Sequence, residues 1–178
     1  MNNLKDLMKR ADKLKYPKKK RLELLEDAIY VLGKNASLTI CMEEVAELID
    51  VIAGNVVDKV DYIHTAEEIA DVLISVEYMK LIYGISKEEI DDVKKTKMKK
   101  KNIALCTIIT LANAQQTISK TIRRKSDSYH KIVPMVQSII DCAEASIKLF
   151  KIKKKDIARI QLLKYKRLEE RLINGELS

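Results

Sequence analysis

Apolar residues recur along almost the whole chain at the three- and four-residue spacing of an amphipathic helix. No stretch alternates apolar and polar residues for long enough to indicate a β-strand. The pattern therefore predicts an all-α protein. The expected helices cover about 3–15, 19–33, 38–53, 65–83, 87–101, 103–123, 128–150 and 153–173.

Small and polar residues indicate where these helices begin and end. Glycines favour C-terminal ends at three positions, which are Gly33, Gly54 and Gly84. Three hydroxyl residues are predicted N-caps: Ser37, Thr65 and Ser86. The last two also precede a glutamate by three residues, which is the capping-box spacing. Pro134 favours a helix start close to its own position.

Two segments of the second half can be aligned with two segments of the first. Ile40–Ile49 aligns with Ile109–Ile118 at an offset of 69, and Tyr83–Ile90 aligns with Phe150–Ile157 at an offset of 67. The two-residue drift falls in the intervening loop, where insertions are tolerated. We interpret this as an internal repeat, although chance similarity between amphipathic helices is an alternative.

The repeat predicts one compact domain with a four-helix core built from two pseudo-repeats. The first unit, 1–102, carries the acidic residues described below, and the second, 103–178, is a degenerate helical repeat that packs on it. The chain of 178 residues, with four Gly and two Pro, suits one mostly helical domain. No apolar run reaches the roughly 18–20 residues of a membrane span, so we expect a cytoplasmic protein without membrane contact.

The formal net charge is +8, and lysine runs at 18–20, 94–101 and 153–155 carry much of the excess. A basic protein favours anionic partners such as nucleotides or nucleic acid. A solvated, lysine-rich surface is the alternative interpretation for each run.

Two stretches, residues 43–49 and 67–73, are nearly identical in pattern. Each places two carboxylates three residues apart, Glu44 with Glu47 and Glu68 with Asp71. On a helix such a pair lies on one face, with β-carbons roughly 5–6 Å apart. Two such helices side by side bring four carboxylates together, which requires a positive partner. Mg²⁺ is the expected partner because it prefers oxygen ligands, and Mn²⁺ is the alternative.

These acids border the apolar stripe of each predicted helix, whereas acids placed only for solubility more often lie opposite it. The alternative is that they are ordinary surface acids. We expect no histidine and no cysteine to lie near the acids, and neither His64 nor His130 has the Glu-x-x-His spacing of a di-iron bundle. We therefore expect magnesium or manganese in preference to zinc or iron.

The arrangement Glu-Glu-x-x-Glu, a gap, and Glu-x-x-Asp resembles the signature of the all-α nucleotide pyrophosphohydrolases. This superfamily includes MazG proteins, dimeric dUTPases and the phosphoribosyl-ATP pyrophosphohydrolases of histidine synthesis. Here the two parts are Glu43–Glu47 and Glu68–Asp71, and the resemblance covers about residues 20–102.

The resemblance implies a MazG-like helical bundle that hydrolyses a nucleoside triphosphate (NTP or dNTP) to a monophosphate and pyrophosphate. It also implies Mg²⁺ ligands at Glu44, Glu47, Glu68 and Asp71. Catalysis would involve Glu43, Glu44 and Glu47, with Glu43 as an outer acid or as a group that orients the attacking water.

Relatives also use basic and amide residues after the fourth helix to contact phosphates, and the corresponding positions are Lys97, Lys101 and Asn102. Rival phosphate contacts in the second half are Arg123, Arg124 and Lys125. Candidates for the base pocket, by residue type alone, are Tyr62, Tyr78, Tyr83 and Asn113.

The second half departs from the family because the alignment replaces every acidic ligand. It is expected to supply packing, and whether it also forms one wall of the pocket is left open by the sequence. The protein is then a monomer with an internal pseudo-dimer, or a homodimer. Two alternatives remain open: a catalytically inactive nucleotide-binding protein, and a nucleic-acid-binding helical protein. The second is disfavoured because aromatic and Arg-rich surfaces typical of single-strand binders are missing from the sequence.

Overall fold

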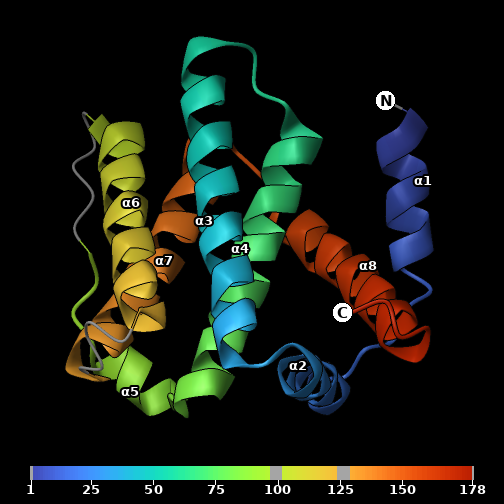
Figure 1. Ribbon diagram of the computed structural model, residues 1–178. Helices are drawn as coiled ribbons and strands as arrows, with labels where there is room; N and C mark the ends of the chain where they lie inside the picture. Colours follow the sequence, from blue (N-terminus) through green and yellow to red (C-terminus); the bar gives the residue numbers. More distant parts are fainter. Residues whose placement is uncertain (1, 97–101, 124–128, 178) are drawn as a thin grey trace.

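The computed structural model describes residues 2–96, 102–123 and 129–177. These described residues form eight helices and no strand, which confirms the all-α prediction (Figure 1). The helices are α1 (Asn2–Ala11), α2 (Lys18–Leu32), α3 (Lys34–Val57), α4 (Tyr62–Tyr83), α5 (Lys87–Asp92), α6 (Ile103–Ile122), α7 (Tyr129–Leu149) and α8 (Lys154–Ile173). No described helix combines the length and the apolar content required to cross a bilayer.

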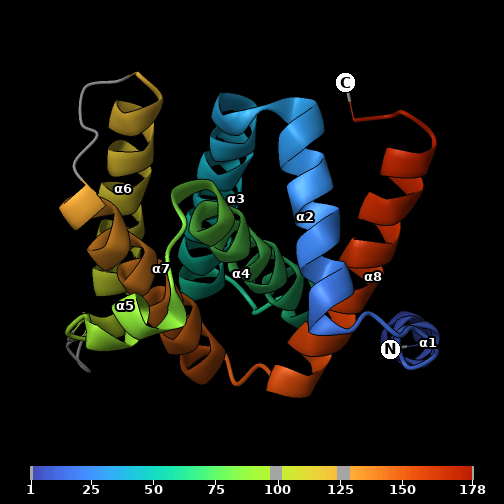
Figure 2. The same ribbon diagram turned by 90° about the horizontal axis from the view of Figure 1, so that it is seen from below.

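Four helices form the centre of the molecule. α3 packs against α4 and α6, while α7 packs against α6 and α4. α8 lies outside this group, against α4, α2 and α1, and Figure 2 shows α2 and α8 next to each other. A continuous apolar core includes residues from both halves of the chain. α8 therefore brings the C-terminal half of the sequence against α4, which carries two of the predicted metal ligands.

Several predicted helix ends are confirmed. Gly33 ends α2 with a positive φ of 79°, and Gly84 ends α4 in the left-handed region with φ 65°. A residue with a Cβ is strained at such φ values, which explains the glycines. Ser86 and Glu89 form the predicted capping box at the start of α5, through hydrogen bonds of 3.1 and 2.8 Å.

α3 is longer at both ends than predicted. It begins at Lys34, so Ser37 lies inside the helix and donates to the Gly33 carbonyl at 3.0 Å instead of acting as an N-cap. This bond to the residue four positions earlier satisfies the hydroxyl within a helix. Gly54 does not end α3, because the N–H of Asp58 still donates to its carbonyl at 2.8 Å. A single glycine costs only about 1 kcal/mol inside a helix, so flanking packing overrides it.

The predicted N-cap of α4 is also wrong. α4 begins at Tyr62, and the N-cap is Asp61, whose carboxylate accepts from the N–H groups of Ile63 and His64 at 3.1 Å each. Thr65 lies within the helix, donates to the Asp61 carbonyl and accepts from Asn55 at 2.7 Å. A carboxylate is the stronger acceptor for helix N–H groups, which explains the earlier start.

The fifth and seventh helices differ from prediction as well. α5 ends at Asp92 and residues 93–96 are not helical, whereas helix was expected to about 101, and residues 97–101 are outside the described ranges. The Thr96 N–H instead donates to the Asp141 carboxylate at 2.5 Å, which takes the chain toward α7. Pro134 lies inside α7 and not at its start.

The connections α4–α5 and α7–α8 share one backbone geometry. Gly84 and Lys151, which the offset of 67 pairs, both have positive φ values of 65° and 54°. In each turn the next N–H donates to a carbonyl five residues earlier, at 2.9 and 3.0 Å. The two turns thus have the same backbone conformation at the positions that the alignment pairs. The duplication itself stays a prediction.

Candidate metal centre

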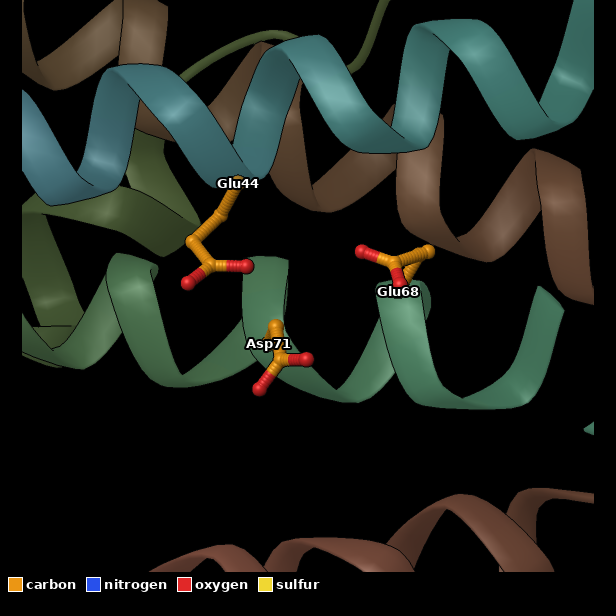
Figure 3. A group of neighbouring side chains, drawn as sticks. All are labelled: Glu44, Glu68 and Asp71. Atoms are coloured by element: carbon orange, nitrogen blue, oxygen red, sulfur yellow. The ribbon is translucent and has the colours of Figure 1, made fainter. Parts of the chain in front are cut away.

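Three of the four predicted acidic ligands lie close together between α3 and α4. Glu44 projects from α3 toward α4, where Glu68 and Asp71 lie on successive turns (Figure 3). One carboxylate oxygen from each of the three residues lies within 4.8 Å of the other two. Bonds of about 2.1 Å place neighbouring ligands of an octahedral Mg²⁺ about 3.0 Å apart and opposite ligands about 4.2 Å apart. The three oxygens are therefore near enough to share one cation once the side chains close in on it.

Glu68 supplies an independent indication that a cation belongs here. The residue is only 7% exposed, and its Oε2 is buried without a hydrogen-bond partner among the described residues. Its Oε1 lies 3.3 Å from Nδ1 of His64, one turn earlier on α4. Buried carboxylate oxygens are normally paired, because desolvation of an unpaired one is costly. The unpaired oxygen lies in the same acidic group that the sequence predicted to bind metal.

The acids hold their protons more tightly than isolated side chains do. Burial raises the pKa of Glu44 to about 8, and the negative charges of Asp71 and Glu47 add to this effect. Burial likewise raises the pKa of Glu68 to about 7, again with contributions from Asp71 and Glu47. Both shifts have the direction expected when carboxylates converge in a partly dry site. A divalent cation would favour the ionised forms and offset this repulsion.

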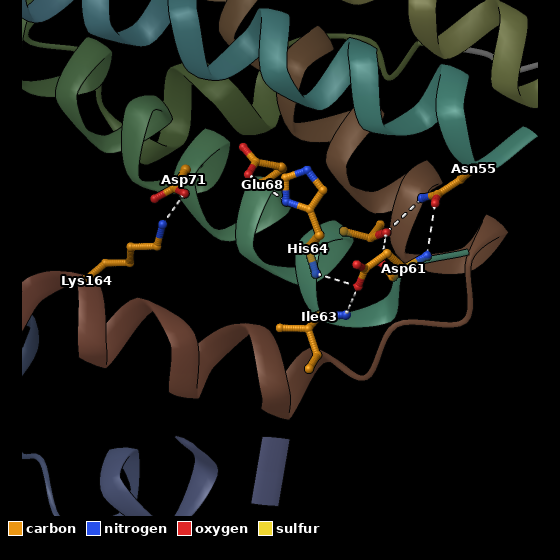
Figure 4. A network of polar contacts seen from close by, with 8 residues as sticks. Asn55, Asp61, Ile63, His64, Glu68, Asp71 and Lys164 are labelled. Carbon is orange, nitrogen blue, oxygen red and sulfur yellow. Dashed lines mark hydrogen bonds and ion pairs between the residues drawn. The ribbon is translucent and has the colours of Figure 1, made fainter. Parts of the chain in front are cut away.

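Asp71 has a protein cation as its partner. The ammonium of Lys164, on α8, forms an ion pair with the Asp71 carboxylate (Figure 4). Burial nevertheless raises the pKa of Asp71, because desolvation outweighs the opposing effects of Lys164 and Arg167. Lys164 thus compensates the negative charge of Asp71 but not the charges of Glu44 and Glu68.

α8 forms a basic wall opposite the acids. Lys164, Arg167 and Arg171 follow one another at spacings of three and four residues, which places them on one face of the helix. All three line a cavity of about 310 Å³, together with Glu44, Glu47, Glu68 and Asp71. One cavity therefore has carboxylates on the α3–α4 side and cations on the α8 side.

The two remaining acidic predictions have different positions. Glu47 lines the cavity, and its charge raises the pKa of Glu44 and Glu68, but it is outside the close group of three. Glu43 is exposed and is not among the described residues that line the cavity. The structure therefore places Glu47 in the cavity, next to Glu68, and Glu43 does not line the cavity among the described residues.

Only two of the predicted phosphate contacts are among the described residues, and neither of the two, Asn102 and Arg123, lines this cavity. Asn102 is exposed at the start of α6, and Arg123 is exposed at the end of α6, where its side chain donates to the Ser119 carbonyl at 3.3 Å. The other four predicted contacts lie outside the described residues: Lys97, Lys101, Arg124 and Lys125.

One of the four base-pocket candidates lines the cavity. Tyr78 is buried, and desolvation raises its pKa further above the usual value. Tyr62 donates instead to Asp156 at the start of α8, at 2.8 Å. Tyr83 has an ammonium group 4.5 Å from its ring centroid, and Asn113 is exposed on α6.

Sequence reasoning missed two features of the site. His64 lies beside Glu68, which corrects the expectation that no histidine is near the acids, and its four-residue spacing from Glu68 was the available signal. The basic wall was missed because it comes from the far end of the chain. Its signal was the regular spacing of Lys164, Arg167 and Arg171 along one predicted helix.

Comparisons of the chain with protein-family models, with curated proteins and with solved structures gave no match. Functional inference therefore depends on the geometry of the cavity and on the resemblance of its acidic pattern to the pyrophosphohydrolase signature.

Proposed function

We propose that this protein is a Mg²⁺-dependent nucleoside triphosphate pyrophosphohydrolase that releases a nucleoside monophosphate and pyrophosphate. The observation that carries the proposal is the single cavity in which carboxylates of α3 and α4 face three cations of α8. The charges of a metal–triphosphate complex are complementary to this arrangement. Its divalent cation would face the carboxylates, and its phosphate oxygens would face the cations of α8. The choice of nucleotide as substrate rests on the resemblance of the acidic pattern.

The donor set fits magnesium. Glu44, Glu68 and Asp71 offer carboxylate oxygens, the ligands that hard divalent cations prefer, and one buried oxygen of Glu68 has no hydrogen-bond partner in the part of the chain that the structure describes. When bound, Mg²⁺ supplies charge neutralisation for phosphate oxygens and lowers the pKa of water. Mn²⁺ has similar ligand preferences and is the expected substitute.

The basic wall is assigned to phosphate binding. Arg167 and Arg171 present planar guanidinium groups, which pair with phosphate oxygens through two parallel hydrogen bonds. Lys164 already contacts Asp71, so arrival of a cation at the acids would release its ammonium toward the phosphates. This assignment is made beside the predicted contacts of Lys97, Lys101 and Asn102, which stay a prediction because Lys97 and Lys101 lie outside the described residues.

Glu47 is assigned to the attacking water. It lines the cavity beside the close group of three acids, within hydrogen-bonding reach of Glu68, and a carboxylate there can accept a hydrogen bond from water. Phosphoryl transfer depends mainly on positioning and on stabilisation of charge, and such an orienting contact is the contribution that it requires from the chain. The role predicted for Glu43, as an outer acid or a group that orients the attacking water, stays a prediction, because Glu43 is not among the described residues that line the cavity.

The proposal also gives the second half of the chain a function. α8 belongs to the C-terminal half, yet it forms one wall of a cavity whose acids belong to the N-terminal half. A degenerate pseudo-repeat that completes the site of the first unit is the simplest account of this arrangement. It favours a monomer with an internal pseudo-dimer over a homodimer with two separate sites.

The test is a screen of the common NTPs and dNTPs with Mg²⁺, with detection of pyrophosphate. The wild-type protein is expected to release pyrophosphate from at least one of them. Glu68→Gln, Glu47→Gln and Asp71→Asn should each abolish release while the chain stays folded. Glu67→Gln is the matched control, because Glu67 is adjacent to Glu68 but does not line the cavity among the described residues.

Two outcomes would overturn the proposal. Magnesium-dependent nucleotide binding without turnover of any substrate would favour the inactive nucleotide-binding alternative. Binding to DNA or RNA that weakens steeply with salt and ignores Glu68→Gln would favour the nucleic-acid-binding alternative.

A further inference from the structure

A second cavity, of about 360 Å³, lies between α2, α4, α7 and α8. Its volume is within the range of pockets that hold small organic ligands. Tyr165 on α8 lines both this cavity and the one that contains the acids, so its buried side chain separates the two. Apart from Tyr165, the two cavities have no lining residue in common.

The charge of this second cavity is opposite to that of the acidic group. Its charged lining residues are Lys18, Arg21, Lys80 and Glu77. Glu77 lies 3.1 Å from the ammonium of Lys80, so these two compensate each other. Lys18 and Arg21 remain without a carboxylate among the described residues of the lining, which gives the cavity an excess of two positive charges.

Arg21 also has an unmet hydrogen-bonding requirement. Its Nε is buried and has no acceptor among the described residues. Its guanidinium carbon lies 5.8 Å from the centroid of the Tyr165 ring, so the aromatic face helps to hold the group in place. A buried N–H normally has an acceptor, and a ligand oxygen in the cavity would provide it once the Arg21 side chain turns this N–H toward the ligand.

The rest of the cavity is apolar. Five carbon-rich side chains from four helices line it, and a single amide accompanies them. The apolar residues are Leu22, Leu73, Val76, Ile140 and Tyr165, and the amide is Gln161. A small inorganic anion would leave this surface uncovered, whereas a ligand with a hydrophobic or ring-shaped body would bury it.

We propose that this cavity binds the phosphate ester of a small organic molecule, independently of any metal. A phosphate monoester carries close to two negative charges at neutral pH, which matches the two uncompensated cations, Lys18 and Arg21. The organic part lies against the apolar residues and the Tyr165 ring. The site is distinct from the metal centre, because its lining contains none of the converging acids.

The experiment follows the Nε–Hε signal of Arg21 by nuclear magnetic resonance while AMP is added to the full chain in EDTA. AMP serves as a phosphate ester with a ring-shaped body, and EDTA removes any contribution of the metal centre. We expect a saturable shift of the Arg21 signal, which is identified by its loss in Arg21→Lys. Binding measured by calorimetry should weaken about tenfold or more in Arg21→Gln.

Two further variants separate this site from the acidic cavity. Lys18→Gln, at an exposed position, should weaken AMP binding without disturbing the core. Arg167→Gln changes the other cavity, so the saturable shift of the Arg21 signal on AMP addition in EDTA should persist in this variant. Absence of a saturable Arg21 shift would overturn the proposal, and so would AMP binding that is lost in Arg167→Gln but retained in Arg21→Gln and Lys18→Gln.

Inorganic phosphate distinguishes the free anion from its ester. If the apolar lining contributes, AMP should bind at least about tenfold more tightly than inorganic phosphate. Equal affinity would contradict the assignment of an organic ester. Because no magnesium and no turnover are involved, these results stand or fall separately from the proposed pyrophosphohydrolase activity.

Discussion

Lys164 on α8 forms an ion pair with Asp71 on α4, although 93 residues separate them along the chain. This contact joins the two halves of the molecule at the acidic group itself. A divalent cation bound to Asp71, as proposed, would have to share this carboxylate with the lysine ammonium. On the proposed account the lysine and the metal would therefore compete for Asp71.

Replacement of Lys164 by methionine is expected to strengthen Mg²⁺ binding and to weaken nucleotide binding. Loss of this partly buried ion pair changes the metal affinity by about 1 kcal/mol, or roughly fivefold, because the cation no longer displaces the ammonium. Titration calorimetry with Mg²⁺ alone and with a non-hydrolysable triphosphate measures the two effects separately.

The matched control for Lys164→Met is Lys166→Met, two residues along α8. Lys166 is exposed and pairs with Glu170 at 3.2 Å, outside the acidic cavity. Its replacement should alter neither affinity. Weaker Mg²⁺ binding in Lys164→Met would mean that the lysine supports the metal site and does not compete with the ion.

The stability of the metal-free protein should fall as the pH rises from about 5 to about 8. The folded-state pKa of Glu44 is about 8 and that of Glu68 about 7, both above the ordinary value of 4.5. Between these values the unfolded chain has lost protons that the folded chain retains. The stabilisation that the protonated Glu44 and Glu68 carboxyl groups contribute is therefore fully present below the ordinary pKa. It is lost as the pH rises through the folded-state pKa of each group.

Thermal unfolding in EDTA across this pH range checks the prediction. The stabilisation by Mg²⁺ should increase over the same interval, because the ligands must lose their protons before the cation binds. The double variant Glu44→Gln/Glu68→Gln should flatten both dependences. A wild-type stability that rises toward pH 8 in EDTA would contradict the account of the acidic group.

Glu68→Gln should stabilise the metal-free protein at about pH 8 while removing the response to Mg²⁺. The amide carries no charge, and its N–H₂ group can donate to the carboxylates of Glu44 or Asp71. Relief of a buried, unpaired carboxylate oxygen is worth about 1–2 kcal/mol. The measurement is urea unfolding with EDTA and with Mg²⁺, and Glu67→Gln is the control that should retain the wild-type response. A Glu68→Gln protein that is still stabilised by Mg²⁺ would exclude Glu68 as a ligand.

Replacement by alanine should change the stability of the protein in opposite directions at two glycines, Gly54 and Gly84. Gly54 lies inside α3, and a Cβ added there meets no atom within 4 Å, so Gly54→Ala should stabilise by roughly 0.5–1 kcal/mol. Gly84 has φ 65°, where a Cβ is strained, so Gly84→Ala should destabilise by about 1 kcal/mol. Urea unfolding of the two variants tests both signs. Stabilisation by Gly84→Ala would contradict the left-handed turn.

The helices and several of their ends could be predicted because the signals are local. The apolar spacing, the left-handed glycines and the Ser86–Glu89 capping box all act within a few residues. Ser37 and Thr65 were misplaced because a hydroxyl that caps a helix can equally donate to a carbonyl four residues earlier. In α4 the competing cap, Asp61, took precedence.

In the candidate site, too, the features that depend on local sequence patterns could be predicted, and the features that depend on long-range packing could not. The convergence of Glu44, Glu68 and Asp71 followed from two local patterns on helices expected to be neighbours. The α8 wall could not be predicted to face them, because its placement depends on how the second half packs against α4. Sequence spacing alone could identify Lys164, Arg167 and Arg171 as one face of a helix, but not the surface opposite that face.

The central claim is that Glu44, Glu68 and Asp71 share one divalent cation, and anomalous diffraction from crystals soaked in Mn²⁺ tests it most directly. The account predicts an anomalous peak between α3 and α4, within bonding distance of a carboxylate oxygen from each of the three residues. Crystals in which the peak lies elsewhere, or in which these carboxylates contact only Lys164 and water at saturating Mn²⁺, would contradict it.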